Sequence, residues 1–233
     1  MNGFRLTVWL CLGLLGAGWP AGATAGQDPV PPKAPFPAEV VARLDQAGAR
    51  QCLEVRVHDP ASITATVQAW EHRPTGWAPA LASFPAVIGR KGLADPGGKR
   101  EGDGKSPAGV FPLGFAFGYA PAAPTRWPYH PAAPDDVWID DPEAPDYNTL
   151  TKKGATTARS FEFLKRPDDL YKYGLVVEYN TRPVVKGHGS AIFVHLWSGP
   201  RSGTAGCVAF DEESMLALLG WLDPTGQAHI FLH

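Results

Sequence analysis

Glycine and proline constrain this chain more than any other feature. The sequence has 26 glycines and 24 prolines, about a fifth of its 233 residues. Both residue types destabilise the interior of a helix, so a helical bundle is excluded. Apolar residues still make up 44% of the chain, which is enough for a packed core. We therefore expect a mainly β fold with a few short helices and long loops.

The charge balance argues against one class of partner. Lysine and arginine together number 21 and aspartate and glutamate 23, for a formal net charge of −2. Domains that bind DNA or RNA usually carry a basic excess. We therefore expect no nucleic-acid partner.

The first 25 residues have the pattern of a secretory signal peptide. Arg5 precedes an apolar run over residues 6–18, and the small residues Ala23 and Ala25 follow it. The run is shorter than the roughly 20 residues of a membrane-spanning helix, although an uncleaved N-terminal anchor is the alternative. We expect cleavage after Ala25, no stable membrane insertion afterwards, and a location in the periplasm or cell envelope.

The remaining chain is expected to form a tether and one domain. Residues 26–37 are proline-rich and predict an extended tether, and residues 38–233 predict the folded domain. Periodicity predicts helices over 38–49 and after the N-cap Asp211. Alternating apolar residues predict strands over 52–58, 63–70, 84–89, 174–179, 191–197, 204–210 and 228–232, the first two joined as a hairpin. The region 90–170 is expected to be rich in loops.

Removal of a signal peptide would leave two cysteines, Cys52 and Cys207. In an exported protein a pair of cysteines indicates either one disulfide or a reactive thiol. Cys52 opens a predicted strand far from the patterned last third of the chain, and we expect it to be structural or free. A bridge between Cys52 and Cys207 remains the alternative.

A histidine and a cysteine near the C-terminus form the strongest chemical pattern. His195 lies in an apolar strand, and Cys207 follows twelve positions later, after turn-forming residues 198–203. An imidazole beside a thiol can take its proton and produce a nucleophile. Gly206 permits close approach of a substrate, and the N–H groups of Gly206 and Cys207 could hold an oxyanion. A buried structural cysteine near a packed histidine is the alternative.

Other chemical patterns are weaker or missing. His188 is a second candidate base, but it lies in a glycine-rich turn where its position would be poorly fixed. The sequence has neither H-E-x-x-H nor paired C-x-x-C motifs, and it has no phosphate-binding loop motif. We infer no metal and no cofactor.

Two segments resemble one known family. His195 followed by Thr204-Ala205-Gly206-Cys207-Val208 resembles the signature of the L,D-transpeptidase catalytic domain, the YkuD family. Residues 103–111 (DGKSPAGVF) resemble the upstream element of that family, and the order of the motifs also agrees. The resemblance covers residues 52–232. Better-known members have a histidine and an arginine at the positions of Ala205 and Ala209, and a longer His–Cys spacing, which indicates a T-A-G-C sub-branch.

The resemblance implies a β-sandwich-like domain that acts on the peptide stems of peptidoglycan, in cell-wall biogenesis and cell shape. Cys207 would form a thioester with the stem, and His195 would act as base and acid, oriented by the Leu196 carbonyl. An amine from a neighbouring stem would then give a 3-3 cross-link or a related cell-wall attachment. Weaker candidates for substrate contacts are Thr204, Trp197, Arg201, Asn180 and Tyr147.

Three alternatives to transfer stay open at this stage. The same Cys/His pair could hydrolyse the thioester, as an L,D-carboxypeptidase or peptidoglycan hydrolase. A degenerate site would leave a non-catalytic cell-wall-binding module. A sortase-like enzyme would have an arginine shortly after the cysteine, and none follows Cys207.

Overall fold

The structure, a computed structural model, describes residues 35–233. The predicted signal peptide and nearly all of the predicted tether lie outside the described residues. No helix within residues 35–233 has the length and apolar character needed to span a membrane. The prediction of a mainly β fold with short helices is confirmed.

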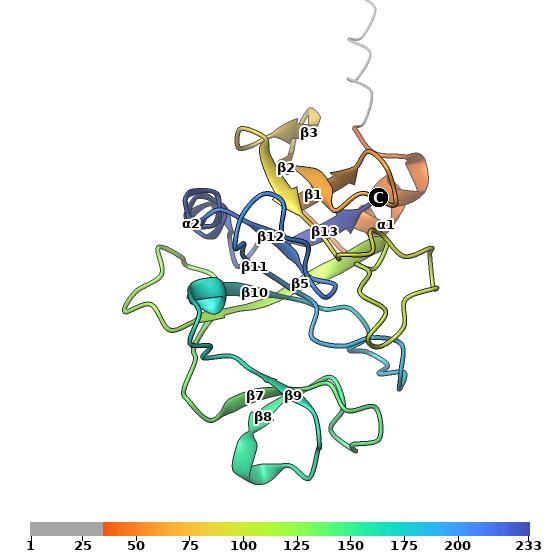
Figure 1. Cartoon of the computed structure of the whole chain (residues 1–233). Coiled ribbons are helices and arrows are strands. Elements are labelled where there is room, and N and C mark those ends of the chain that lie inside the picture. The colour runs from red at the N-terminus through yellow and green to blue at the C-terminus, as the bar shows by residue number, and fades with distance from the viewer. Residues whose placement is uncertain (1–34) are drawn as a thin grey trace, which may run out of the picture. The chain divides into compact units, whose positions relative to one another are not determined.

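A mixed β-sheet that closes on itself is the centre of the domain (Figure 1). Its path runs β1-β13-β5-β10-β11-β12-β4-β2, and pairing of β1 with β2 closes it, while β3 pairs with β2 and β6 with β5. Closure leaves the paired strands of this path without free edges. The strands are β1 (Gln51–Val57), β2 (Thr64–Arg73), β3 (Gly76–Pro79), β4 (Phe84–Val87), β5 (Gly109–Gly118), β6 (Tyr129–Pro131), β10 (Tyr173–Val177), β11 (Phe193–Leu196), β12 (Val208–Phe210) and β13 (His229–Leu232).

Two helices complete the main body. Helix α2 (Glu212–Trp221) begins where the predicted N-cap Asp211 accepts a hydrogen bond from Ser214 N–H. Its buried Met215, Leu218 and Leu219 join the core inside the sheet. Helix α1 (Ala38–Gln46) packs with a second apolar cluster, which also contains Phe36 and Cys52. Phe36 belongs to the predicted tether segment, yet its ring is buried among Trp70, Trp77 and Phe231.

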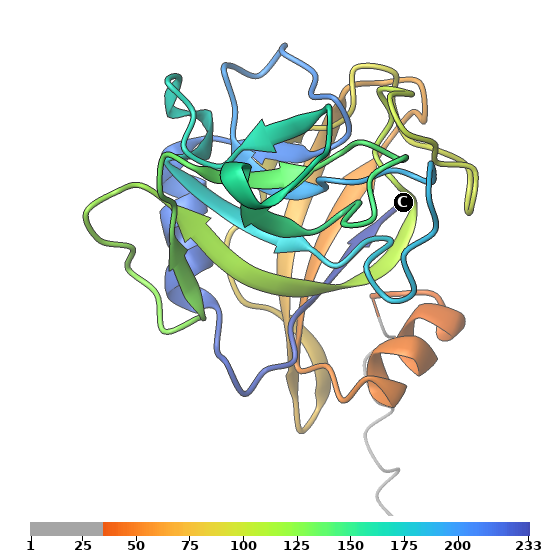
Figure 2. The ribbon, with the colours of Figure 1, turned by 90° about the horizontal axis from the view of Figure 1, so that it is seen from below.

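A second, three-stranded sheet has the order β8-β7-β9. It consists of β7 (Asp136–Ile139), β8 (Leu150–Lys152) and β9 (Phe161–Phe163), with the short 3-10 turns η1 (Lys153–Ala155) and η2 (Asp169–Tyr171) after β8 and β9. Trp138 and Leu164 from this region pack with Phe117 and Phe193 of the main sheet. The small sheet therefore covers the outer face of the main sheet, opposite the inner core (Figures 1 and 2).

The predicted helices and strands are present, with ends shifted by a few residues, and so is the first hairpin. Residues 90–170 are rich in loops, as expected, but the region also contains strands that the sequence did not predict: β5, β6 and the whole small sheet. The ten-residue strand β5 pairs with both β10 and β13. Its sequence contains Gly109, Pro112 and Gly114, which are unfavourable in strands, and they hide the alternation.

Candidate active site

The two predicted catalytic residues lie on neighbouring parallel strands. His195 of β11 pairs with Ala209 of β12, and Val194 with Val208. Extending this register by one residue sets Cys207 against Phe193, whose N–H donates to Cys207 Sγ at 3.4 Å. Because side chains alternate along a strand, Val194 faces the inner core, whereas His195 and Cys207 share the outer face beneath the small sheet. Cys207 lies on the strand next to that of His195, two residues before Ala209, the partner of His195.

The environment of His195 fixes both its orientation and its charge. Its Nδ1 lies 2.8 Å from the carbonyl oxygen of Leu196, so Nδ1 carries the proton and Nε2 the lone pair. The Tyr171 ring packs edge-on against the imidazole at 5.1 Å. Burial lowers the pKa of His195 to about 4, which leaves the ring neutral at pH 7. A neutral imidazole with a free Nε2 can act as a base.

The thiol of Cys207 is also held in its neutral form. Burial, with the charge of Glu162 as a second cause, raises the pKa of Cys207 to about 12. Its S–H donates to the carbonyl oxygen of Ala191 at 3.3 Å. Among the described residues both cysteines, Cys52 and Cys207, are free thiols, so the disulfide alternative is not realised in this structure. The resting pair is a thiol and an imidazole rather than two ions.

The upstream sequence element holds the turn that carries Cys207. Ser106 Oγ accepts from Gly89 N–H at 3.0 Å, donates to the Gly206 carbonyl at 2.6 Å, and lies 3.2 Å from the Cys207 carbonyl. Thr204 Oγ1 donates to the Cys207 carbonyl at 2.7 Å. A Cβ on Gly206 would lie 2.9 Å from the Lys105 carbonyl oxygen, so glycine permits this close approach. Two motifs about a hundred residues apart in sequence therefore form one structural unit.

A hollow of about 180 Å³ opens beside Cys207. Three carboxylates line it, from Glu101, Asp140 and Glu162, together with the cations Arg90 and Lys99. Lys99 is buried and its ammonium bonds to Asp103 at 2.7 Å. Cys207 lines the hollow, whereas His195 does not. The wall beside the thiol is thus polar, with more acidic than basic groups.

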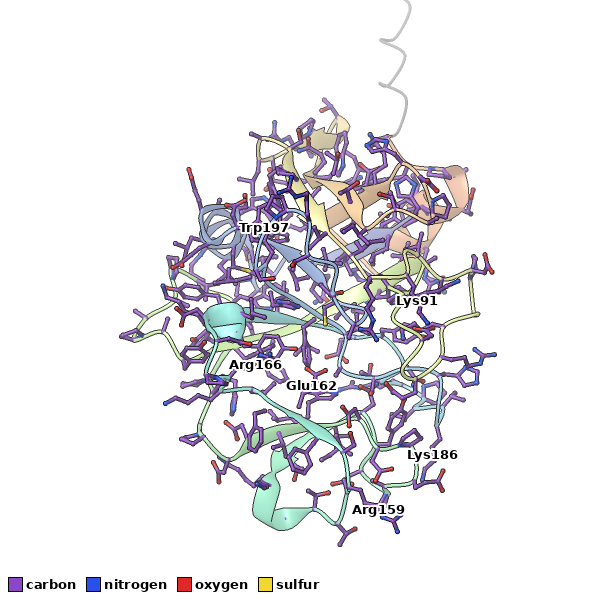
Figure 3. All side chains as sticks on the ribbon, viewed as in Figure 1. Lys91, Arg159, Glu162, Arg166, Lys186 and Trp197 are labelled. Carbon is purple, nitrogen blue, oxygen red and sulfur yellow. The ribbon has the colours of Figure 1, made fainter. Side chains whose placement is uncertain are left out.

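Glu162 links the small sheet to the histidine. Its neighbours Phe161 and Phe163 pack on the far side of β9, so Glu162 points toward the main sheet (Figure 3). Its carboxylate accepts a hydrogen bond from the Tyr171 hydroxyl at 2.5 Å. Burial raises the pKa of Glu162. Tyr171 in turn contacts His195. Sequence patterns do not reveal Glu162 or Tyr171, because neither belongs to a recognisable motif.

A strained backbone position orients the carbonyl that meets the sulfur. Ala191 has a φ of +51°, which is unfavourable for a residue with a side chain. Its N–H donates to Asn148 Oδ1 at 3.1 Å, and the same oxygen accepts from Trp138 Nε1 at 2.8 Å. Asn148 therefore holds Ala191 against Cys207, and an isolated asparagine in a loop gives no signal of this in the sequence.

The family model of the L,D-transpeptidase catalytic domain, YkuD, matches residues 72–230, about two thirds of the chain. The chain belongs to the YkuD family. YkuD domains form a family of cysteine-dependent L,D-transpeptidases that act on peptidoglycan. No curated protein and no solved structure matches the chain.

The remaining predicted residues of this YkuD domain have other surroundings. Gly206 N–H, a candidate oxyanion donor, is bonded to Thr204 Oγ1 at 3.0 Å. The Thr204 hydroxyl is therefore used within the turn. Cys207 N–H has no acceptor among the hydrogen bonds of residues 35–233 and is the donor that remains available. The Leu196 carbonyl lies where the resemblance implied, against His195.

The weaker candidates for substrate contacts do not line the Cys207 hollow. The buried Tyr147 donates to Glu101 at 2.5 Å and accepts from Gly189 N–H, so it supports the wall from behind. Trp197 packs against the inner core near α2 (Figure 3), and Arg201 is exposed in the loop before Thr204. Asn180 lies in the loop after β10 and bonds to Val185 and Gly189. The competing base His188 lies in this same loop, outside the hollow.

Proposed function

We propose that this YkuD domain transfers acyl groups on peptidoglycan stem peptides, with Cys207 as nucleophile and His195 as base and acid. Membership of the family supports the class of reaction. The observation that carries the proposal is the outer face shared by β11 and β12, which holds an oriented neutral imidazole and a free thiol, and the thiol adjoins a hollow.

The first half of the reaction makes a thioester. His195 Nε2 takes the proton from Cys207 Sγ as the sulfur attacks the carbonyl carbon of the L-centre of the diamino acid. Cys207 N–H stabilises the negative oxygen that forms. The C–N bond to the terminal D-alanine then breaks, and the imidazolium gives its proton to the leaving amine. Because both groups start neutral, charge separation arises only while substrate fills the hollow.

The second half transfers the acyl group. An amine from a neighbouring stem attacks the thioester carbonyl, His195 Nε2 takes the amine proton, and the C–S bond breaks. The proton then returns to the sulfur and restores the neutral pair. The product is a 3-3 cross-link between two stems. We propose the cell envelope as the location, because that is where this polymer is found.

Two groups position the base in this proposal. The Leu196 carbonyl fixes the proton on Nδ1, and the Tyr171 ring fixes the tilt of the imidazole. Glu162 holds Tyr171 through its hydroxyl. We therefore treat Tyr171 and Glu162 as positioning residues, and Ser106 as the residue that holds the Cys207 turn.

Product analysis tests the function. The full chain is incubated with purified disaccharide tetrapeptide, with and without an excess of acceptor stem, and the products are separated and identified by mass. We expect a dimer joined through two diamino acids together with release of D-alanine. Formation of tripeptide without any dimer, even with excess acceptor, would mean that the domain hydrolyses the thioester instead of transferring the acyl group. The absence of any product, with and without acceptor, would overturn the enzymatic proposal.

A further inference from the structure

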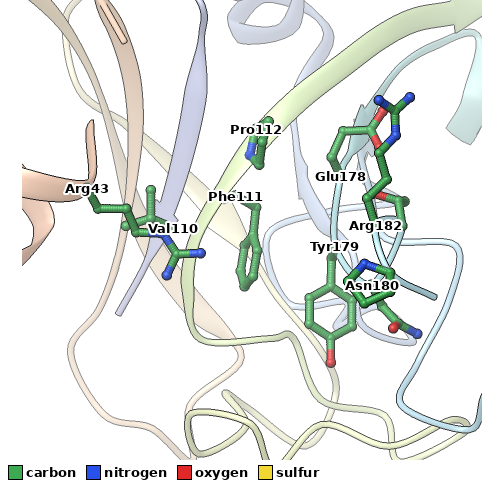
Figure 4. A pocket seen from close by; sticks show the side chains of 10 residues that line it. Arg43, Val110, Phe111, Pro112, Glu178, Tyr179, Asn180 and Arg182 are labelled. Carbon is green, nitrogen blue, oxygen red and sulfur yellow. The ribbon is translucent and has the colours of Figure 1, made fainter. Parts of the chain in front are cut away.

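A second hollow lies between three segments that are distant in the sequence. It measures about 510 Å³ and is formed by α1, the start of β5 and the loop that follows β10. Arg43 lies on one side, and Glu178 and Arg182 lie on the other (Figure 4). The rings of Phe111 and Tyr179 meet edge-on between them, with centroids 5.2 Å apart. We call this the arginine hollow. Its volume is within the range of small-molecule sites.

The charged groups of the arginine hollow are not paired within the described chain. Of the eleven arginines in residues 35–233, four have a carboxylate oxygen within 4 Å, namely Arg56, Arg73, Arg126 and Arg166. Among the ion pairs of residues 35–233, none involves Arg43, Arg182 or Glu178, although a glutamate lines the same hollow. The hollow therefore presents two guanidinium groups and one carboxylate to an incoming ligand.

One loop connects the arginine hollow with the candidate active site. Tyr179 and Asn180 line the arginine hollow, and residues 190–192 at the other end of the loop line the hollow at Cys207. The loop is fixed by hydrogen bonds from Tyr179 Oη to the His188 carbonyl and from Asn180 Nδ2 to the Gly189 carbonyl, at 2.7 and 2.8 Å. A polymer held at Cys207 could thus extend to the arginine hollow along the same loop.

We propose that the arginine hollow binds a carboxylate-bearing stem peptide of the wall polymer, separate from the peptide bond that reacts at Cys207. Guanidinium groups are suited to carboxylates, because two N–H donors match the two oxygens. The two rings offer apolar surface to the methyl groups of alanine residues, and Glu178 suits an ammonium group. The identity of the polymer rests on the proposed function, whereas the charge pattern of the hollow does not.

Charge reversal in the arginine hollow tests the proposal. The double variant Arg43→Glu/Arg182→Glu is compared with wild type in pelleting with isolated sacculi at low salt. The matched control is Lys91→Glu/Arg159→Glu, which makes the same change in net charge at residues outside the hollow (Figure 3). A second arm uses sacculi whose carboxyl groups have been converted to amides. Acylation of Cys207 by a carbapenem is measured for every variant.

We expect the hollow variant to bind untreated sacculi about tenfold more weakly than wild type, and the control variant to bind within about twofold. Amidated sacculi should bind wild type as weakly as untreated sacculi bind the hollow variant. Equal binding of wild type and hollow variant, or an equal loss in both double variants, would overturn the proposal. Acylation of Cys207 should be unchanged by either double variant, so a failure of this binding site is distinguishable from a failure of the proposed chemistry.

Discussion

Cys52 and Cys207 are both buried free thiols whose pKa is raised by burial, yet their surroundings differ. Cys52 of β1 packs among Phe36, Val40 and Leu44, in an apolar cluster under α1. Cys207 adjoins a polar hollow and lies on the same face as His195. A raised pKa therefore does not distinguish the two thiols. The adjoining hollow and the neighbouring histidine do distinguish them, and the predictions below test whether that difference makes Cys207 the reactive thiol.

The largest expected effect comes from replacing each of the two cysteines in turn by alanine. Cys207→Ala should reduce turnover of the tetrapeptide by at least about 10⁴-fold, because the nucleophile is lost. Cys52→Ala should leave turnover within about twofold and lower the unfolding free energy by about 1 kcal/mol, because it only removes packed volume. Turnover and thermal unfolding of both variants decide this. Loss of turnover in Cys52→Ala with a normal fold would remove the contrast.

The second effect concerns the base. His195→Ala should reduce the rate of carbapenem acylation by about 10³-fold, in the range of general base catalysis. His188→Ala is the matched control and should stay within about twofold, because His188 lies in the loop outside the Cys207 hollow. Stopped-flow measurement of acylation compares the two. The opposite ranking would transfer the role of base to His188.

The third effect tests the contact between the two sequence motifs. Ser106→Ala removes the hydroxyl that bonds to the Gly206 carbonyl and leaves buried backbone groups at Gly89 and Gly206 without this partner. We expect a loss of about 1–3 kcal/mol in the unfolding free energy and slower acylation. Ser202→Ala, in the exposed loop before Thr204, is the control. Chemical denaturation with both variants measures the difference, and an equal effect would mean that Ser106 does not hold the turn.

A fourth prediction addresses the charge of Glu162. Glu162→Gln keeps an acceptor for the Tyr171 hydroxyl but removes a negative charge that raises the pKa of Cys207. The thiol pKa should fall, so alkylation by iodoacetamide should be up to about tenfold faster at a given pH. Alkylation of Cys207 is followed from pH 6 to pH 10, because the thiolate fraction of a thiol with a pKa of about 12 rises about 10⁴-fold over that range. An unchanged or slower reaction would contradict the predicted influence of Glu162.

The smallest expected effect is the response of wild type to moderate acid. With a pKa of about 4, His195 stays mostly neutral from pH 7 to about pH 5, so carbapenem acylation should change less than about twofold over that interval. An imidazole with its ordinary pKa would lose more than about tenfold. Folding stability should respond to the same histidine. Its pKa is higher in the unfolded chain, which therefore takes up the proton first as the pH falls. The folded state should thus lose stability as pH drops from about 6.5 toward 4. Acylation rates measured across this range provide the check.

The sequence predicts the site best where a pattern is local. The placement of His195 and Cys207 on adjoining strands and the N-cap Asp211 follow from strand alternation, a turn and helix capping, which are all encoded within a few residues, whereas the catalytic roles come from the resemblance to the YkuD signature. Strand β5 escapes prediction because Gly114 and Pro112 are tolerated only through its neighbours in the closed sheet. Glu162 and Asn148 escape for a different reason. They reach the site only after the small sheet folds over β11, and no short-range pattern encodes that contact.

Mapping a covalent adduct tests the central claim most directly. Wild type, Cys52→Ala and Cys207→Ala are incubated with a carbapenem, and intact mass and peptide mapping identify the modified residue. We expect one adduct per chain, on Cys207, in wild type and in Cys52→Ala, and none in Cys207→Ala. An adduct on Cys52, or one that persists in Cys207→Ala, would contradict the assignment of Cys207 as the nucleophile.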